Sequence, residues 1–249
     1  MTDLSRMKLG RKAVVTDTRT LRLATYLRPT LPAPPAATDW TRGIRDWGMM
    51  CNDRLGCCTI AGAAHAIQVW TANQGTLQTL PDAVIEQYYA AWDGYVPGDA
   101  QTDNGGIEID VLKLWKNQGL DGNKLLAFAD ARTSNLKEIR QAIHLFGGVY
   151  IGVDLPLTAQ RQAVWDLDSS AGSDATKGSW GGHCVFVPQY DQTSFTCITW
   201  GQLKTMTVDF WQAYCDEAHA LLDQSWLGAR RSPNGFDKKQ LMDDLELIR

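Results

Sequence analysis

The sequence predicts an α+β fold in which a helical first half precedes a strand-rich second half. Apolar residues recur at helical spacing from Cys58 to Gly147, and short β-rich runs separated by turn residues follow Gly182. The chain has 249 residues, of which 44% are hydrophobic and 21% charged. We therefore expect a globular protein with a substantial core.

Charge and hydropathy exclude several classes of function. The formal net charge is -4 and no long basic block is present, which argues against a nucleic-acid partner. No apolar run approaches the length of a membrane span, and the first residues lack the apolar segment of a signal peptide. The expected location is therefore the cytoplasm, with no membrane partner.

The cysteines predict free thiols, because the chain shows no export signal. None of them forms a C-x-x-C pair or lies in a His cluster with zinc-ligand spacing, so we expect no metal and no cofactor. The six are Cys51, Cys57, Cys58, Cys184, Cys197 and Cys215.

The chain divides by composition. Residues 1–38 contain "LRPTLPAPPAAT" and predict an extended N-terminal arm. The main domain is expected over 39–230, mainly helical over 39–150 and mainly β over 151–230. Residues 231–249 form a charged C-terminal tail.

Four helices are expected in the first half. The first carries small residues that suit close packing on every side, and Gly75 is placed to stop it. Pro81 and Asp82 begin the second. The predicted ranges are 59–75, 80–92, 107–119 and 135–147.

Strands and one more helix complete the prediction. Residues 149–155 read as a buried strand, and 166–182 as a long Gly/Ser/Asp-rich loop. Short strands follow in the ranges 183–191, 194–200 and 204–209. The stretch "VDFWQAYCDEAHALL", 208–222, is expected to close the domain as a helix.

Cys58 is the candidate nucleophile. It stands at the start of a predicted helix, where unpaired amides and the helix dipole lower a thiol pKa. Gly56 permits a tight turn before it. A small buried residue in a packed helix is the competing interpretation, and for Cys57 that interpretation is preferred.

A base has to come from elsewhere in the chain, which has four histidines. His65 and His144 lie inside predicted helices, and His219 lies in the closing segment. His183 follows Gly181-Gly182 and opens the apolar strand "HCVFV". It is the best candidate for a fixed base, against the alternative of a satisfied histidine at a strand start.

Several stretches in order resemble the papain family of cysteine proteases, over nearly all of residues 39–220. They are "TDW" at 38–40, "NDRLGCC" at 52–58, "DNGG" at 103–106, "LKEIRQAIHLFGGVYIGVDL", "GGHCVFVPQYD" and "ITWG" at 198–201. The resemblance implies a papain-like fold, with a cleft between a helical half and a β-rich half. It assigns Cys58 as nucleophile and His183 as its partner.

The resemblance also implies roles for residues around that pair. Asn52 would stand near the oxyanion hole, with the backbone amide of Cys58 as the other donor. Gly105 and Gly106 would pair with an extended substrate backbone. Trp200 would shield the histidine from water.

The chain departs from the family at several of these positions. The asparagine that orients the histidine is Ile198 when aligned on W-G, and Thr199 when counted without a gap from His183. Asn52 replaces a longer glutamine. Leu55 and Asp103 occupy the positions of a family disulfide, which is therefore absent.

Together these features predict a divergent papain-like thiol hydrolase that cleaves a peptide or amide bond in a peptide or protein substrate. The departures at 198–199 and 52 keep a second hypothesis open, a catalytically weak or inactive protein that binds a peptide or protein partner. A third is acyl transfer of the transglutaminase or isopeptide type, which a Cys-His pair also serves.

Overall fold

The computed structural model describes residues 4–227, 237, 239–240 and 243. The predicted tail 231–249 lies almost wholly outside these residues. The division of the chain into arm, main domain and tail stays a prediction.

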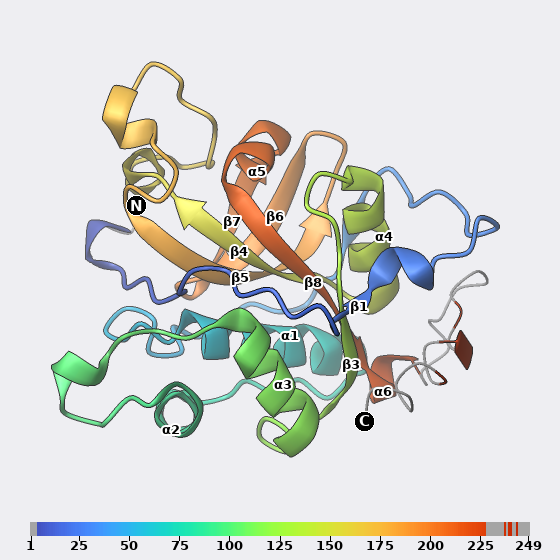
Figure 1. The fold of residues 1–249 in the computed structure, drawn as a ribbon, viewed down its shortest axis with the longest axis horizontal. Helices are drawn as coiled ribbons and strands as arrows, with labels where there is room; N and C mark the ends of the chain where they lie inside the picture. The colour runs from blue at the N-terminus through green and yellow to red at the C-terminus, as the bar shows by residue number, and fades with distance from the viewer. Residues whose placement is uncertain (1–3, 228–236, 238, 241–242, 244–249) are drawn as a thin grey trace.

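One mixed sheet runs through the molecule (Figure 1), in the order β1-β3-β8-β4-β5-β6-β7, with β2 pairing β5. β1 and β3 are parallel, and the other pairings are antiparallel. The strands are β1 Leu21–Arg22, β2 Thr38–Asp39, β3 Leu125–Asp130, β4 Val149–Leu155, β5 Gly181–Tyr190, β6 Ser194–Thr199, β7 Gln202–Thr207 and β8 Cys215–Asp223.

Helices cover both faces of the sheet. Figure 1 shows α1, α2 and α3 together below the strands, and α4 and α5 above them. The α-helices are α1 Cys58–Asn73, α2 Asp82–Asp93, α3 Glu108–Gln118, α4 Leu136–Phe146, α5 Val208–Tyr214 and α6 Gln224–Trp226. Short 3-10 helices are η1 Leu4–Arg6, η2 Leu23–Thr25, η3 Ala100–Thr102, η4 Leu157–Gln160 and η5 Gly172–Ala175. The predicted α+β class is confirmed.

Strand β5 separates two hydrophobic cores. Its side chains alternate between the faces of the sheet, as the strand period requires. Cys184 and Phe186 belong to the core formed with α1, α2 and α3. Val185 and Val187 belong to the core formed with α4 and α5. A residue of β5 is therefore directed to one core or the other by its position alone.

Helix α1 packs closely on the sheet because it carries small residues. A Cβ added at Gly62 would lie 3.1 Å from Tyr150 Cε2 and 3.3 Å from Cys184 Sγ. The Tyr150 hydroxyl donates to the Thr59 carbonyl at 2.8 Å. These contacts hold the first turn of α1, and with it Cys58, against β4 and β5.

The prediction of a single closing helix over 208–222 is wrong in its second half. Only Val208–Tyr214 is helical, and Cys215–Asp223 forms β8 between β3 and β4. A strand buried on both faces reads as an apolar run, which spacing cannot distinguish from a buried helix. The sequence analysis also missed β3, whose pairing with β8 is non-local.

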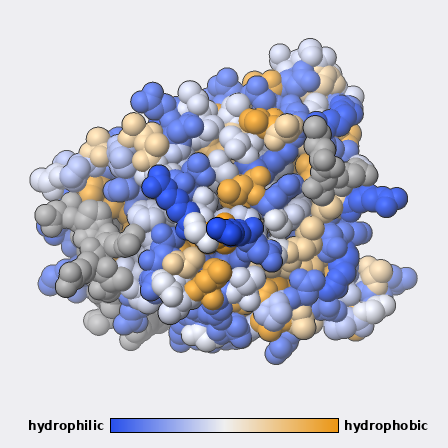
Figure 2. Space-filling view, turned by 180° about the vertical axis from the view of Figure 1, so that it is seen from behind, coloured by the Kyte–Doolittle hydropathy of each residue, from blue (hydrophilic) through white to orange (hydrophobic). Residues whose placement is uncertain are grey.

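The N-terminal arm lies on the rest of the chain. It is drawn in blue in Figure 1, and it runs between the lower helices and the strands. Its β1 pairs with β3 and its β2 with β5. In the part of the chain that the structure describes, no helix is long and apolar enough to cross a membrane. Figure 2 shows hydrophobic side chains scattered among hydrophilic ones over the opposite face.

Candidate active site

Cys58 is the first residue of α1 and its side chain is fully buried. Its sulfur accepts the backbone N–H of Cys184 at 3.4 Å, and the backbone N–H of Gly10 also points to it. The neighbouring Cys57 has a different environment, because its thiol donates to the Met50 carbonyl at 3.3 Å. The two adjacent cysteines are therefore not equivalent, and only Cys58 faces both β5 and the arm.

His183 lies near the start of β5 and is fully buried. Its Nε2 lies 2.7 Å from the Thr199 hydroxyl, while Nδ1 has no hydrogen-bond partner within the described ranges. The Trp200 ring stacks on the imidazole, with centroids 4.5 Å apart and planes at 13°. Of the two positions left open by the sequence, Thr199 contacts the histidine, while Ile198 packs in the core around α1.

Strand β5 carries His183 directly before Cys184, which contacts Cys58. His183 and Cys58 are far apart in sequence, but Cys184, which follows His183 directly, donates its N–H to the Cys58 sulfur. The pairing of β5 with β4 sets this position, with His183 opposite Val153 and Cys184 opposite Gly152. The predicted nucleophile is therefore in contact with the residue that directly follows the predicted base.

Burial keeps both groups uncharged in this structure. Burial raises the pKa of the Cys58 thiol to about 12, although the N–H groups of Cys184 and Gly10 lower it. Burial also lowers the pKa of His183 to about 3, and the positive charge of Arg11 lowers it further. The pair is therefore a neutral thiol and a neutral imidazole rather than a thiolate and an imidazolium.

The N-terminal arm covers this pair with a run of backbone hydrogen bonds. Gly106 N–H donates to the Gly10 carbonyl at 2.8 Å, and Lys12 N–H donates to the Gly106 carbonyl at 2.8 Å. On the other side, Arg11 N–H donates to the Gly182 carbonyl at 3.0 Å. The arm therefore binds as an extended chain between the segment before α3 and the start of β5.

Glycines line the arm on both sides. A Cβ at Gly105 would lie 1.9 Å from the Gly10 carbonyl oxygen, and one at Gly182 would lie 2.4 Å from the Arg11 carbonyl oxygen. We call the backbone strip formed by Gly56, Gly105, Gly106, Gly181 and Gly182 the arm-binding groove. The Gly105 N–H donates to the Tyr89 hydroxyl at 2.8 Å, so of the predicted pair Gly105 and Gly106 it is Gly106 that forms backbone hydrogen bonds with the arm.

Asn52 is buried beside the same arm. Its Nδ2 donates to the Leu55 carbonyl at 3.2 Å and to the Lys8 carbonyl at 3.4 Å. The Trp200 indole N–H donates to that same Lys8 carbonyl at 3.2 Å. Asn52 and Trp200 thus converge on one carbonyl oxygen of the arm.

Next to the sulfur, the Arg11 side chain enters a buried acidic pocket formed by Glu108, Asp154, Asp216 and Glu217. The guanidinium Nη1 donates to Glu217 at 2.8 Å, and Nη2 donates to Asp216 at 3.0 Å and to Asp154. Burial lowers the pKa of Arg11, but the four carboxylates outweigh burial and raise it above its ordinary value.

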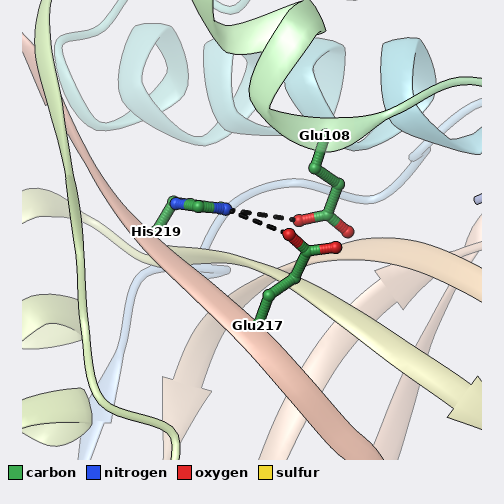
Figure 3. Close-up of side chains that lie close together, drawn as sticks. All are labelled: Glu108, Glu217 and His219. Carbon is green, nitrogen blue, oxygen red and sulfur yellow. Dashed lines mark hydrogen bonds and ion pairs between the residues drawn. The ribbon is translucent and has the colours of Figure 1, made fainter. Parts of the chain in front are cut away.

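His219 closes the far side of this pocket. Figure 3 shows its Nε2 directed at Glu108 and Glu217, at 3.9 Å and 3.4 Å, and its Nδ1 lies 3.0 Å from Asp130. Burial lowers the pKa of His219, but the hydrogen bonds to Asp130 and Glu217 and the charge of Glu108 raise it to about 9. His219 therefore carries a positive charge at neutral pH.

Glu108, Glu217 and His219 are also the described residues whose spacing could hold a metal ion, with ligand atoms within 4.8 Å of one another. A metal-bound imidazole has to be neutral, and a cation repels nearby positive groups. Here the Arg11 guanidinium donates to Glu217, and the hydrogen bonds to Asp130 and Glu217 raise the pKa of His219. The arrangement fits an ion-pair network better than a metal centre.

The sequence analysis missed this pocket. Arg11 belongs to an arm that was read only as extended, and Glu217 lies in the segment assigned to a helix. The sequence does contain one indication of the pocket. In "CDEAHALL", the side chains of Asp216, Glu217 and His219 lie within an apolar run. Charged residues in a buried segment are rarely left without partners.

Comparison with known proteins supports the fold. No family model matches the sequence, and no curated protein matches it. Solved structures of cysteine proteases are similar. Xylellain from Xylella fastidiosa superposes with a TM-score of 0.66 at 13% identity, over 87% of this chain and 96% of that one.

Two further structures are described as precursor forms. Digestive procathepsin L 3 from Tenebrio molitor larval midgut has a TM-score of 0.58 at 13% identity, over 88% of this chain and 77% of that one. The ragweed pollen cysteine protease Amb a 11 in its proform has a TM-score of 0.55 at 13% identity, over 78% and 67%. These likenesses establish a papain-like fold.

Proposed function

We propose that this papain-like chain is a thiol hydrolase acting on a peptide or amide bond, and that the arm holds it in a blocked form. Cys58 is the nucleophile and His183 is the base. The observation that carries the proposal is the orientation of His183, which Thr199 and Trp200 hold in place one residue before the N–H group that contacts the Cys58 sulfur. A buried imidazole that donates Nε2–H to Thr199 keeps a basic Nδ1 available to take the thiol proton.

The remaining roles follow from this assignment. The Cys58 sulfur attacks the carbonyl carbon of the substrate, while the backbone N–H of Cys58 and the amide of Asn52 bind the developing oxyanion. Proton transfer from His183 to the departing amine leaves an acyl-enzyme, which water then hydrolyses. Gly106 binds the substrate backbone, and Trp200 shields the imidazole.

The arm blocks the site in two ways. It occupies the groove, and it presents to the sulfur an N–H group, that of Gly10, rather than a carbonyl carbon that a thiolate could attack. It also keeps the pair buried and adds the charge of Arg11 near His183. Once the arm leaves, water and the loss of that charge favour the thiolate–imidazolium pair.

A second candidate is peptide binding without catalysis. The neutral state of Cys58 and His183 favours it, because a thiol with a pKa of about 12 is not nucleophilic at neutral pH. Acyl transfer stays a hypothesis that no contact in the structure favours over hydrolysis.

Alkylation of the full-length chain tests the proposal. The variant Gly10→Ala, whose added Cβ would clash with Gly56, opens the arm without changing a residue of the pair. We expect iodoacetamide to label Cys58 in this variant at pH 6, as mapped by peptide mass spectrometry, and a fluorogenic peptide to be hydrolysed.

Three further variants on this background provide controls. His183→Ala should abolish both the labelling at pH 6 and the hydrolysis, and Cys58→Ser should abolish the hydrolysis. Cys57→Ser should change neither, since Cys57 faces Met50. Labelling of Cys58 that rises only above pH 8, as for an ordinary thiol, together with no hydrolysis, would favour the binding protein.

A further inference from the structure

We propose that the acidic pocket is the specificity pocket of this site and that it selects a peptide with an arginine side chain one residue from the position at Cys58. The inference rests on the proposed function in one respect only, that the substrate binds in the arm-binding groove. Arg11 is the occupant that the structure supplies, because its side chain is 1% exposed and fills the pocket.

The pocket matches the shape of a guanidinium. Glu217 accepts from Nη1, whereas Asp154 and Asp216 accept from Nη2, so carboxylates meet both ends of the planar fork. A lysine ammonium is a compact point charge and cannot reach both ends. The same contacts therefore predict a preference for arginine over lysine.

The floor of the pocket leaves room for the arginine stem. Gly152 in β4 lies opposite Cys184, next to His183 in the register of the sheet. A Cβ added there would lie 2.8 Å from Arg11 Cδ, from Glu108 Oε1 and from Glu217 Cγ. The absence of a side chain at Gly152 makes space for the aliphatic part of an arginine, close to the reacting pair.

Without a basic occupant, Asp154, Asp216 and Glu217 would lose the guanidinium that they bind, while burial raises the pKa of Glu108 well above its ordinary value. Among the residues that the structure describes, His219 and Lys177 also form ion pairs with these carboxylates, and Lys177 lies 3.9 Å from Asp154 and 3.7 Å from Asp216. Glu108 is 1% exposed, and among the described residues its carboxylate has a hydrogen bond with the Cys184 side chain and an ion pair with His219 at 3.9 Å. Carboxylates buried in this way favour a cationic ligand over a neutral one.

A cavity beside the pocket makes it accessible from outside. It has a volume of about 300 Å³ and is lined by Val14–Asp17 of the arm on one side, and by Asp216, Glu217 and His219 on the other. Displacement of the arm would join this cavity to the pocket and open both to an incoming peptide.

Binding of short peptides to full-length variants tests the assignment. Arg11→Ala empties the pocket, and Lys12→Ala is its matched control, since Lys12 is the neighbouring basic residue but is exposed. The probes are fluorescein-labelled peptides of sequence Lys-Leu-Gly-Xaa-Lys, with arginine, lysine, citrulline or leucine at Xaa. Fluorescence anisotropy should show the arginine peptide binding Arg11→Ala at least about tenfold tighter than the citrulline peptide, and Lys12→Ala binding neither.

Charge variants of the pocket sharpen the test. Glu217→Gln added to Arg11→Ala should reduce the difference between arginine and citrulline peptides to about twofold. Asp209→Asn, which removes an exposed carboxylate on α5, should leave the difference unchanged. The Gly10→Ala chain keeps all pocket residues and should show the same preference, which guards against misfolding of Arg11→Ala. Equal binding of the four peptides, or no binding of the arginine peptide, would overturn the assignment.

Hydrolysis of the same peptides separates this inference from the proposed function. An arginine preference in binding supports the pocket whether or not these peptides are cleaved, because a peptide bound as the arm is bound presents an N–H group to the sulfur. The hydrolase is contradicted separately, if Gly10→Ala fails to hydrolyse the fluorogenic peptide. Cleavage of all four peptides at equal rates supports the hydrolase and contradicts the pocket.

Discussion

Gly10 of the arm lies so close to Gly56, two residues before Cys58, that a Cβ on Gly10 would be 1.8 Å from the Gly56 carbonyl oxygen. No side chain fits there without a shift of backbone. The relationship ties the arm to the turn that presents Cys58, and it makes Gly10 the position at which the arm is most easily displaced.

Hydrogen exchange checks this relationship directly. In Gly10→Ala the amides of Arg11, Lys12 and Gly106, which donate across the arm-binding groove, should exchange at least about tenfold faster than in the native chain. Gly43→Ala is the control, because an added Cβ there meets nothing within 4 Å, even though Gly43, unlike Gly10, has a positive φ, of 87°. Unchanged protection in Gly10→Ala would contradict the close packing.

Replacement of Thr199 tests the support of His183. Thr199→Val keeps the shape but removes the hydroxyl 2.7 Å from His183 Nε2, which leaves a buried nitrogen without a partner. We expect the free energy of unfolding to fall by about 1–3 kcal/mol and, in the Gly10→Ala background, Cys58 alkylation at pH 6 to slow. Thr199→Ser retains the hydroxyl and should stay near the parent in both measurements. A Thr199→Val chain that is as stable and as reactive as its parent would show that the contact is incidental.

The buried histidines contribute to stability with opposite pH dependence on the two sides of pH 6.5. Burial lowers the pKa of His65 to about 4 and that of His183 to about 3, so between these values and 6.5 the unfolded chain binds more protons, and stability falls as the pH falls. For His219, burial lowers the pKa but the contacts with Asp130 and Glu217 raise it to about 9. The stabilisation of the folded state by His219 is complete below pH 6.5 and is lost as the pH rises through 9.

Urea unfolding at a series of pH values measures how the free energy of unfolding changes with pH below and above pH 6.5. For each proton by which the folded and unfolded states differ, the free energy of unfolding changes by about 1.4 kcal/mol per pH unit. His65→Gln should reduce the slope on the acid side by about one proton and leave the alkaline side unchanged, whereas His219→Gln should do the reverse. The same acid slope in His65→Gln and the native chain would contradict the neutral, buried state of His65.

Local signals in the sequence accounted for the helices that carry or support the site. The small residues between Thr59 and Gly75 predicted α1, and Gly56 together with a helix start distinguished Cys58 from Cys57. These predictions depend on neighbours a few residues apart, which periodicity and turn chemistry can report.

The order of the strands in the sheet could not be predicted from these local patterns. The segment Cys215–Asp223 was predicted as helix because its burial hides the period of a strand, and β8 exists because β3 and β4 pair on either side of it. The partner of His183 was likewise open between Ile198 and Thr199. Successive side chains of β6 point to opposite faces of the sheet. Ile198 therefore packs in the core around α1, and Thr199 lies beside the His183 imidazole.

By itself the sequence determined the α+β class, the ordered papain-like stretches, and Cys58 and His183 as the candidate pair, because each leaves a local trace in composition, spacing or a turn. Tertiary structure alone decided that Gly10 and Arg11 of the arm lie against that pair, and that Glu108, Asp154, Asp216 and Glu217 surround one guanidinium. Residues more than 200 positions apart meet there. Such contacts arise from the pairing of distant strands, for which no local pattern in the chain provides a signal.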